Sequence, residues 1–273
     1  MKTPVCRSVH RLNRRTVIQS AAAVMLIPVF SAAHAQLAVS TAINRAARFR
    51  ALSQRISKVY CQIHMGVLPS QAQSVLVSAR QQVRKGFEDL ALVQWPADLA
   101  RHVADIQKQA DTLEALLIVP PSRDSVAAVA GQSDKMMAAS QAATEAFEKY
   151  AKVNTAKLVN TAGRQRALSQ RLARNYFLVA AKLDQKGMQE QIQADATEFR
   201  LALDALAAAP ISTPAIRNEL ELGRGQWLFF EAALQRKPDD KGLETVATTS
   251  ERILEVTNKL TDLYDGALKE VLG

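Results

Sequence analysis

The sequence predicts an all-α protein made of two tandem up-down four-helix bundles that share one long central helix. Three observations carry this prediction: strong helix formers dominate, prolines and glycines are few and lie between helical stretches, and a seventeen-residue segment occurs twice. Aromatic residues make up only 5% of the 273 residues, and runs of β-branched residues are missing. Ala, Leu, Gln, Lys, Arg and Glu take their place, and these residues favour helices.

Prolines and glycines mark the expected helix ends. Pro69 follows Gly66, Pro120 and Pro121 stand together, and apolar residues recur at helical spacing between such points. The pattern predicts seven helices, at about 37–65, 70–94, 97–118, 122–186, 188–208, 214–236 and 241–271.

The fourth of these helices is unusually long. From Ser122, a favourable N-cap, to Lys186 no proline occurs. A helix over 122–186 is roughly 95 Å long at 1.5 Å per residue. We expect one continuous rod that closes the first bundle and opens the second; a break near residues 153–155 is the alternative.

The internal repeat defines two halves. Asn44–Tyr60 reads NRAARFRALSQRISKVY and Asn160–Tyr176 reads NTAGRQRALSQRLARNY, with ten of seventeen positions identical at an offset of 116. Residues 133–137 align with 250–254 at an offset of 117. We therefore expect a first four-helix unit over 36–152 and a second over 153–273.

The N-terminus has the features of an export signal. Residues 1–35 carry five basic and no acidic residues, an apolar run from Val17 to Phe30, and Ala33-His34-Ala35 before Gln36. This is the pattern of a signal peptide cleaved after Ala35, and the apolar run is short for a membrane span. The pair Arg14-Arg15 favours the twin-arginine route over ordinary secretion. We expect a periplasmic protein; an uncleaved anchor is the alternative.

Removing the leader changes the charge and the cysteine count. The 35 basic residues less the leader's five leave 30 against 26 acidic residues, a net charge of +4 that does not predict nucleic-acid binding. Cys61 alone remains, so we expect a buried apolar thiol and no internal disulfide. Only His64 and His102 remain besides, and no His/Cys cluster, catalytic triad or phosphate loop is present. We expect no metal, no cofactor and no enzymatic activity.

The second copy of the repeat separates into two faces when wound as a helix. One face is the expected core stripe. Its residues are Leu158, Ala162, Leu168, Ser169, Leu172 and Tyr176. The neighbouring stripe holds Asn160, Gly163, Arg166 and Gln170, of which none is acidic. A helical glycine costs about 1 kcal/mol relative to alanine, and an arginine presents a planar fork of donors that fits a planar oxyanion.

A packing seam is the competing interpretation of this stripe. Gly163 then serves close helix contact, and Arg166 pairs with a carboxylate of a neighbouring helix. On spacing alone the packing seam is favoured. Arg164, Arg171 and Arg174 lie outside the stripe, where we expect solvated side chains.

The segments AINRAARFRALSQR and LVNTAGRQRALSQRLARNYF resemble the signature helix of the PilJ/NarX-type sensory domain. That family comprises periplasmic four-helix bundles of nitrate/nitrite-sensing histidine kinases and of type IV pilus chemoreceptors. The resemblance implies a nitrate-binding box whose glycine and arginine correspond to Gly163 and Arg166. In the first copy the arginine corresponds to Arg50, but Ala47 replaces the glycine.

The resemblance shifts the balance towards a soluble periplasmic sensor of nitrate or nitrite that reports to a membrane-bound partner. The candidate anion ligands are Gly163, Arg166, Asn160, Gln170, Arg50 and Asn44. In the family's receptors, helices from two subunits enclose the anion. In this protein either the duplication recreates the pairing within one chain, or two chains form a homodimer. A ligand-free adaptor that docks to a chemoreceptor, pilus or sensor kinase is the alternative function.

Overall fold

The computed structural model describes residues 29–152, 154–211 and 213–272, and these ranges contain eight helices and no strands. The expected all-α class is confirmed. The helices are α1 (Val29–His64), α2 (Pro69–Ala91), α3 (Ala97–Leu116), α4 (Arg123–Ala151), α5 (Asn154–Ala180), α6 (Gln185–Ala207), α7 (Pro214–Leu234) and α8 (Asp240–Leu272).

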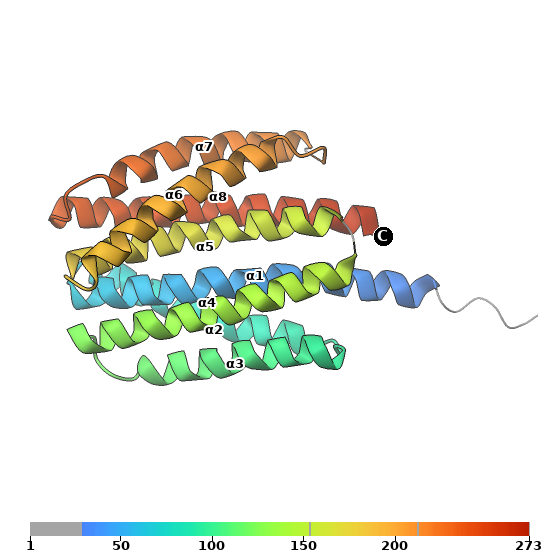
Figure 1. Ribbon diagram of the computed structural model, residues 1–273, viewed down its shortest axis with the longest axis horizontal. Helices are drawn as coiled ribbons and strands as arrows, with labels where there is room; N and C mark the ends of the chain where they lie inside the picture. Colours follow the sequence, from blue (N-terminus) through green and yellow to red (C-terminus); the bar gives the residue numbers. More distant parts are fainter. Residues whose placement is uncertain (1–28, 153, 212, 273) are drawn as a thin grey trace, which may run out of the picture.

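Two helices, α4 and α5, stand where we expected a single rod over 122–186. Helix α4 ends at Ala151, Lys152 adopts a left-handed conformation (φ 56°), and α5 begins at Asn154 and runs back beside α4 (Figure 1). The prediction of a shared central helix is therefore wrong, and the alternative break near 153–155 is confirmed. Helix α1 packs against both α4 and α5, and this tertiary packing overrides the local helical propensity.

The two helices that carry the repeat, α1 and α5, run parallel in the middle of the molecule (Figure 1). Helices α2 and α4 pack against α1, and α3 packs against α4. Helices α6 and α8 pack against α5, and α7 packs against α8. Helix α8 also contacts α1. As a result α3 and α7 lie at opposite edges of the molecule.

Helix α1 begins at Val29, earlier than the expected position near residue 37, and its first part extends beyond the other helices in Figure 1. The expected leader lies for the most part, at residues 1–28, outside the described residues. Among the helices that are described, none combines the length and the apolarity needed to cross a membrane.

Local sequence signals account for the start of α4 and for parts of the core. The Ser122 side chain caps α4 by accepting a hydrogen bond from the Ser125 backbone N–H, as the sequence predicts. Buried aromatic rings fill the second half of the core, where Phe199 stacks on Trp227 with ring centroids 4.3 Å apart. Cys61 is a fully buried free thiol, so that prediction is confirmed.

Candidate functional site

Helices α1 and α5 meet at Ala47 and Gly163, which are equivalent positions of the two repeat copies. A Cβ atom added to Gly163 would lie only 2.9 Å from the Ala47 Cβ. Ordinary carbon contacts are longer, so a side chain at position 163 forces the helices apart. The glycine therefore permits a close approach of the two repeat helices, as the packing interpretation of the stripe requires.

Arg50 and Arg166, also equivalent positions, point towards the same glycine. The added Cβ of Gly163 would lie 3.3 Å from Nη2 of Arg166 and 3.4 Å from Nη2 of Arg50. Both arginines are fully buried. Two guanidinium groups therefore share the space beside a backbone position that carries no side chain.

Arg166 is held by neutral side chains. Its Nη2 donates to Oδ1 of Asn44 over 2.7 Å, and its Nη1 donates to Oδ1 of Asn258 over 3.5 Å. Its Nε is buried and has no hydrogen-bond partner among the residues that the structure describes. A buried, unpartnered donor on a charged group costs free energy and calls for an acceptor.

Arg50 repeats this arrangement from the other helix. Its Nη1 donates to Oε1 of Gln141, and its Nη2 donates to the backbone O of Asn160 over 3.3 Å. Gln141 and Asn258 are equivalent at the offset of 117, and Asn160 is equivalent to Asn44 at the offset of 116. The hydrogen bonds thus relate the two halves by a pseudo-two-fold axis between α1 and α5.

Each of these two asparagines also binds a carboxylate, which lies on its far side from the arginine. Asn44 Nδ2 donates to Asp265 over 3.2 Å and to Asp262 over 3.3 Å, while Asn160 Nδ2 donates to Glu148 over 2.6 Å. Glu148 and Asp265 are again equivalent at the offset of 117. The asparagines therefore separate the carboxylates from the arginines, and no ion pair of the described residues includes Arg50 or Arg166.

The environment disfavours the charge on both arginines. Burial, followed by repulsion from Arg164 and Arg166, lowers the pKa of Arg50 to about 9. Burial and the charge of Arg48 lower the pKa of Arg166 to about 9, against the opposing effect of Asp262 and Asp265. A base with a lowered pKa is still protonated at neutral pH, but its charge costs folding free energy there. An anion between the arginines would offset this cost.

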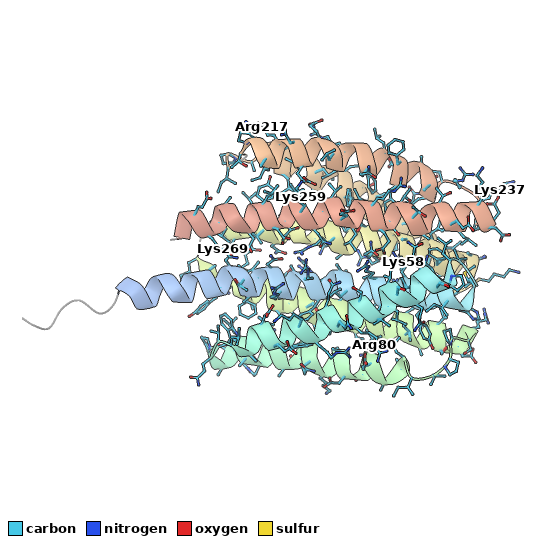
Figure 2. All side chains as sticks on the ribbon, turned by 180° about the vertical axis from the view of Figure 1, so that it is seen from behind. Lys58, Arg80, Arg217, Lys237, Lys259 and Lys269 are labelled. Carbon is cyan, nitrogen blue, oxygen red and sulfur yellow. The ribbon has the colours of Figure 1, made fainter. Side chains whose placement is uncertain are left out.

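Gln170, also expected at the site, has other partners. Its Nε2 donates to the Ser250 backbone O over 2.8 Å, and its Oε1 accepts from Lys58 over 2.8 Å. Lys58 is fully buried and also donates to Glu251 over 2.5 Å, between α1 and α8 (Figure 2). Gln170 belongs to this second polar cluster and is not free to hold a ligand beside Gly163.

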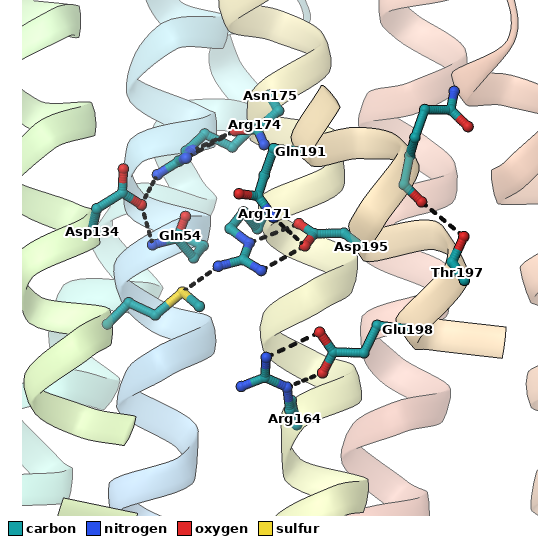
Figure 3. Close-up of polar contacts among 12 residues, drawn as sticks. Gln54, Asp134, Arg164, Arg171, Arg174, Asn175, Gln191, Asp195, Thr197 and Glu198 are labelled. Atoms are coloured by element: carbon teal, nitrogen blue, oxygen red, sulfur yellow. Dashed lines mark hydrogen bonds and ion pairs between the residues drawn. The ribbon is translucent and has the colours of Figure 1, made fainter. Parts of the chain in front are cut away.

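The three arginines expected to be solvated are instead engaged in ion pairs (Figure 3). Arg174 is almost fully buried and donates to Asp134, so the expectation is wrong for this residue. Arg171 binds both carboxylate oxygens of Asp195, and Arg164 binds those of Glu198. The two arginine side chains are only partly exposed, Arg171 to 16% and Arg164 to 32%. The acids come from neighbouring helices, whose positions the winding of a single helix does not give.

The pair Arg174–Asp134 is the counterpart of Lys58–Glu251 under the repeat. Each basic residue lies on the repeat helix of one half and each acid on the fourth helix of the other half. In each pair a buried basic side chain meets a partly exposed acid, and the two pairs connect the halves reciprocally, in addition to the contact between α1 and α5.

Four further residues contribute to the site and were not predicted from the sequence: Gln141, Glu148, Asn258 and Asp265. All four lie on α4 and α8, where only residues 133–137 and 250–254 had been aligned. Extending that alignment at the same offset pairs Gln141 with Asn258 and Glu148 with Asp265. An amide residue followed seven residues later by an acid, in both halves, is the signal that would have found them.

Residues 151–251 match the sequence profile of a family described as PilJ, the N-terminal domain of type IV pili methyl-accepting chemotaxis transducers. This range contains α5, α6, α7 and the first part of α8, and it includes Gly163 and Arg166. No curated protein and no solved structure matches the chain. Residues 151–251 are therefore similar to the PilJ-type sensory domain of chemotaxis transducers, and this similarity covers the second half of the chain only.

Proposed function

We propose that this protein is a periplasmic binding or sensory protein for a small oxyanion, nitrate or nitrite first, which it holds between Arg50 and Arg166. The observation that carries the proposal is the convergence of two fully buried guanidinium groups on Gly163 without a paired carboxylate. Buried charges in proteins are normally paired, so this arrangement favours an external counterion.

The donors present suit a planar anion. The unpartnered Nε of Arg166 and the two Nη2 groups beside Gly163 supply charge-assisted hydrogen bonds from both sides. Asn44 and Asn160 orient the arginines, and Gly163 places no side chain between them. In this proposal the ligand site comprises Arg50, Arg166, Gly163, Asn44 and Asn160, and Gln170 lies outside it, bound to Lys58 and Ser250.

The proposal includes a tandem organisation. Residues 36–152 are a second sensory unit of the same type as 153–273, and the duplication supplies within one chain the two arginines that a receptor dimer supplies from two subunits. The reciprocal hydrogen bonds of Arg50 and Arg166, at the repeat offset, support this organisation. A membrane-bound signalling protein would receive the signal.

A ligand-free adaptor is the second candidate, and the 2.9 Å approach between Ala47 and a Cβ at Gly163 favours it. In that case the arginines complete a packing seam, and the protein docks to its chemoreceptor, pilus or kinase partner without any ligand. The two functions predict different responses to anions.

Thermal melts with and without millimolar nitrate, nitrite or sulfate separate these functions. For the sensor we expect nitrate or nitrite to raise the melting temperature of the wild type and to leave that of Arg166→Ala unchanged. Arg101→Ala is a matched control, because it removes an exposed arginine of α3 and should keep the full shift. A wild type whose melting temperature is the same in all anions, together with a destabilised Arg166→Ala, supports the adaptor instead.

A further inference from the structure

The guanidinium of Arg48 on α1 forms no ion pair and no hydrogen bond with any residue that the structure describes. Its side chain is nevertheless only partly exposed. Burial lowers the pKa of Arg48, and the charges of Arg45 and Arg55 lower it further, against the opposing effect of the exposed Asp262 on α8. Charged groups that are removed from water are normally paired, so the unpaired fork of Arg48 needs an explanation.

The second half of the molecule contains the same arginine together with an acid. Helices α2 and α6 begin and end at equivalent positions at the offset of 116, at which Arg48 corresponds to Arg164 and Gln82 to Glu198. Arg164 binds both carboxylate oxygens of Glu198, through Nε and, over 3.0 Å, through Nη2 (Figure 3). In the first half the amide of Gln82 stands in place of this acid and donates to Ser78 over 3.1 Å. The repeat therefore keeps the arginine twice but its carboxylate once.

A pocket of about 40 Å³ lies beside Arg48, between α1 and α2. It is lined by Arg45, Arg48, Phe49, Leu52, Gln82, Lys85 and Gly86. Phe49 and Gly86 form an apolar wall, where a Cβ added to the glycine would lie only 2.7 Å from the Phe49 ring. A water-sized group needs about 10–15 Å³ of such space, so the pocket holds about three heavy atoms. Three heavy atoms make up a carboxylate group, which is the group that Glu198 supplies in the second half.

The pocket has a surplus of positive charge. Arg45 and Lys85 line it together with Arg48, and both approach Asp89, at 2.7 Å and 3.1 Å. Lys85 also lies 3.8 Å from the exposed Glu88. Three basic residues against these two acids leave a surplus of one positive charge. A single anionic group beside Arg48 would balance it.

We propose that this pocket binds the carboxylate group of a small organic acid, which Arg48 holds through two parallel hydrogen bonds, as Arg164 holds Glu198. A guanidinium fork matches the two oxygens of a carboxylate, and the apolar wall strengthens the interaction by excluding water on one side. Gln82 contributes a neutral amide where a glutamate would repel the ligand. The rest of the acid extends into solvent past Lys85, whose side chain is 68% exposed.

This site is separate from the proposed nitrate site. Neither Arg50 nor Arg166 lines the pocket, and both are fully buried. Nitrate is a weaker hydrogen-bond acceptor than a carboxylate, so the pocket should remain largely empty at nitrate concentrations that fill the site between Arg50 and Arg166. The two proposals are independent.

Calorimetric titration with acetate tests the carboxylate site, at an ionic strength held constant with chloride. We expect the wild type to bind one acetate per chain with a dissociation constant in the millimolar range. Arg48→Gln should weaken binding at least tenfold, because it removes the guanidinium fork. Arg101→Gln is the matched control, since it removes an exposed arginine of α3 and should bind like the wild type. A wild type without acetate heat, or Arg48→Gln with full affinity, would overturn the proposal.

A carboxylate placed within the chain should compete with the ligand. Gln82→Glu recreates the pair seen at Arg164 and Glu198, so it should abolish acetate binding and raise the melting temperature. Gln81→Glu adds the same charge at an exposed position of α2 and should still bind acetate. Full acetate affinity in Gln82→Glu, or equal losses in both variants, would contradict a site at Arg48.

Two further titrations separate this site from the nitrate site. Arg166→Ala should keep acetate binding, and Gln82→Glu should keep nitrate binding. Acetate binding that is lost in Arg166→Ala and kept in Arg48→Gln would place acetate at the buried arginines and overturn the proposal. A wild type that binds acetate but not nitrate would contradict the proposed nitrate function and leave the carboxylate site supported.

Discussion

Arg50 of α1 and Arg166 of α5 approach Gly163 so closely that a Cβ there would lie within 3.4 Å of Nη2 of either residue. They come from parallel helices, occupy equivalent positions of the repeat, and are both fully buried. Each guanidinium is bound by an amide side chain and by an asparagine of the other half.

Gly163→Ala should destabilise the protein although alanine is the better helix former. The new methyl group would lie 2.9 Å from the Ala47 Cβ, and overpacking of this kind costs about 1–3 kcal/mol, against a gain of about 1 kcal/mol in helix propensity. Adding Ala47→Gly should restore much of the stability, because one methyl group then remains between the helices. Chemical denaturation of the three variants measures this, and an equally unstable double variant would count against a shared packing point.

The stability of the wild type should fall in acid through Glu251. Burial alone would raise the pKa of Glu251, but the charge of Lys58 and hydrogen bonds from Arg55 and Lys58 outweigh it and lower the pKa to about 2. A carboxyl with a lowered pKa stabilises the fold above its ordinary value of 4.5, and this contribution disappears as the pH falls from 4.5 to 2. Glu251→Gln should be less stable than the wild type at pH 6, and the difference should shrink towards pH 2. A constant difference in melting temperature across this range would contradict the ion pair.

The two halves should unfold together. Lys58–Glu251 and Arg174–Asp134 cross between the halves, and α1 buries one face against α5. A half expressed alone would expose to water the apolar residues with which α1 and α5 pack against each other, so each half is expected to be unstable alone. Calorimetry of the whole protein should give one cooperative transition, and residues 36–152 expressed separately should not show one. Two resolved transitions would indicate independent units.

Cys61 should be unreactive in the folded protein. Burial raises the pKa of its thiol to about 12, so at pH 8 the reactive thiolate is almost absent, and the sulfur is inaccessible. In the mature protein, from which the leader with Cys6 has been removed, a colourimetric thiol reagent should label Cys61 only at the rate of unfolding and label the denatured protein at once. Rapid labelling of the native protein would place Cys61 at an accessible position.

The sequence predicted those parts of the fold that depend on local signals. The all-α class, the cap at Ser122 and the burial of Cys61 follow from composition, capping chemistry and side-chain polarity. The break between α4 and α5 has no such signal, because neither glycine nor proline occurs there. The left-handed conformation at the break is taken by Lys152, a residue type that does not predict it. Contacts of α1 with both helices determine it, and these contacts are not local in the sequence.

In the candidate site, too, the sequence predicted the residues that the repeat identifies but not their partners on other helices. The repeat identified Arg50, Arg166 and Gly163, because the two copies can be compared position by position. The partners of Arg174 and Gln170 were not predicted, since both depend on which helices become neighbours. For the same reason the sequence shows Ala47 in the first copy where the second copy has Gly163, but not that Arg50 and Arg166 are both fully buried beside that glycine.

Isothermal titration of nitrate into the wild type, Arg50→Ala and Arg166→Ala tests the central claim, that the two arginines form one anion site. We expect one nitrate or nitrite bound per chain by the wild type. Each single substitution should weaken binding by about 30- to 1,000-fold, or roughly 2–4 kcal/mol, and Arg166→Lys should bind poorly because it keeps the charge but loses the planar fork. Arg101→Ala should bind like the wild type. Absence of binding heat in the wild type, two anions per chain, or full affinity in either alanine variant would contradict the shared site.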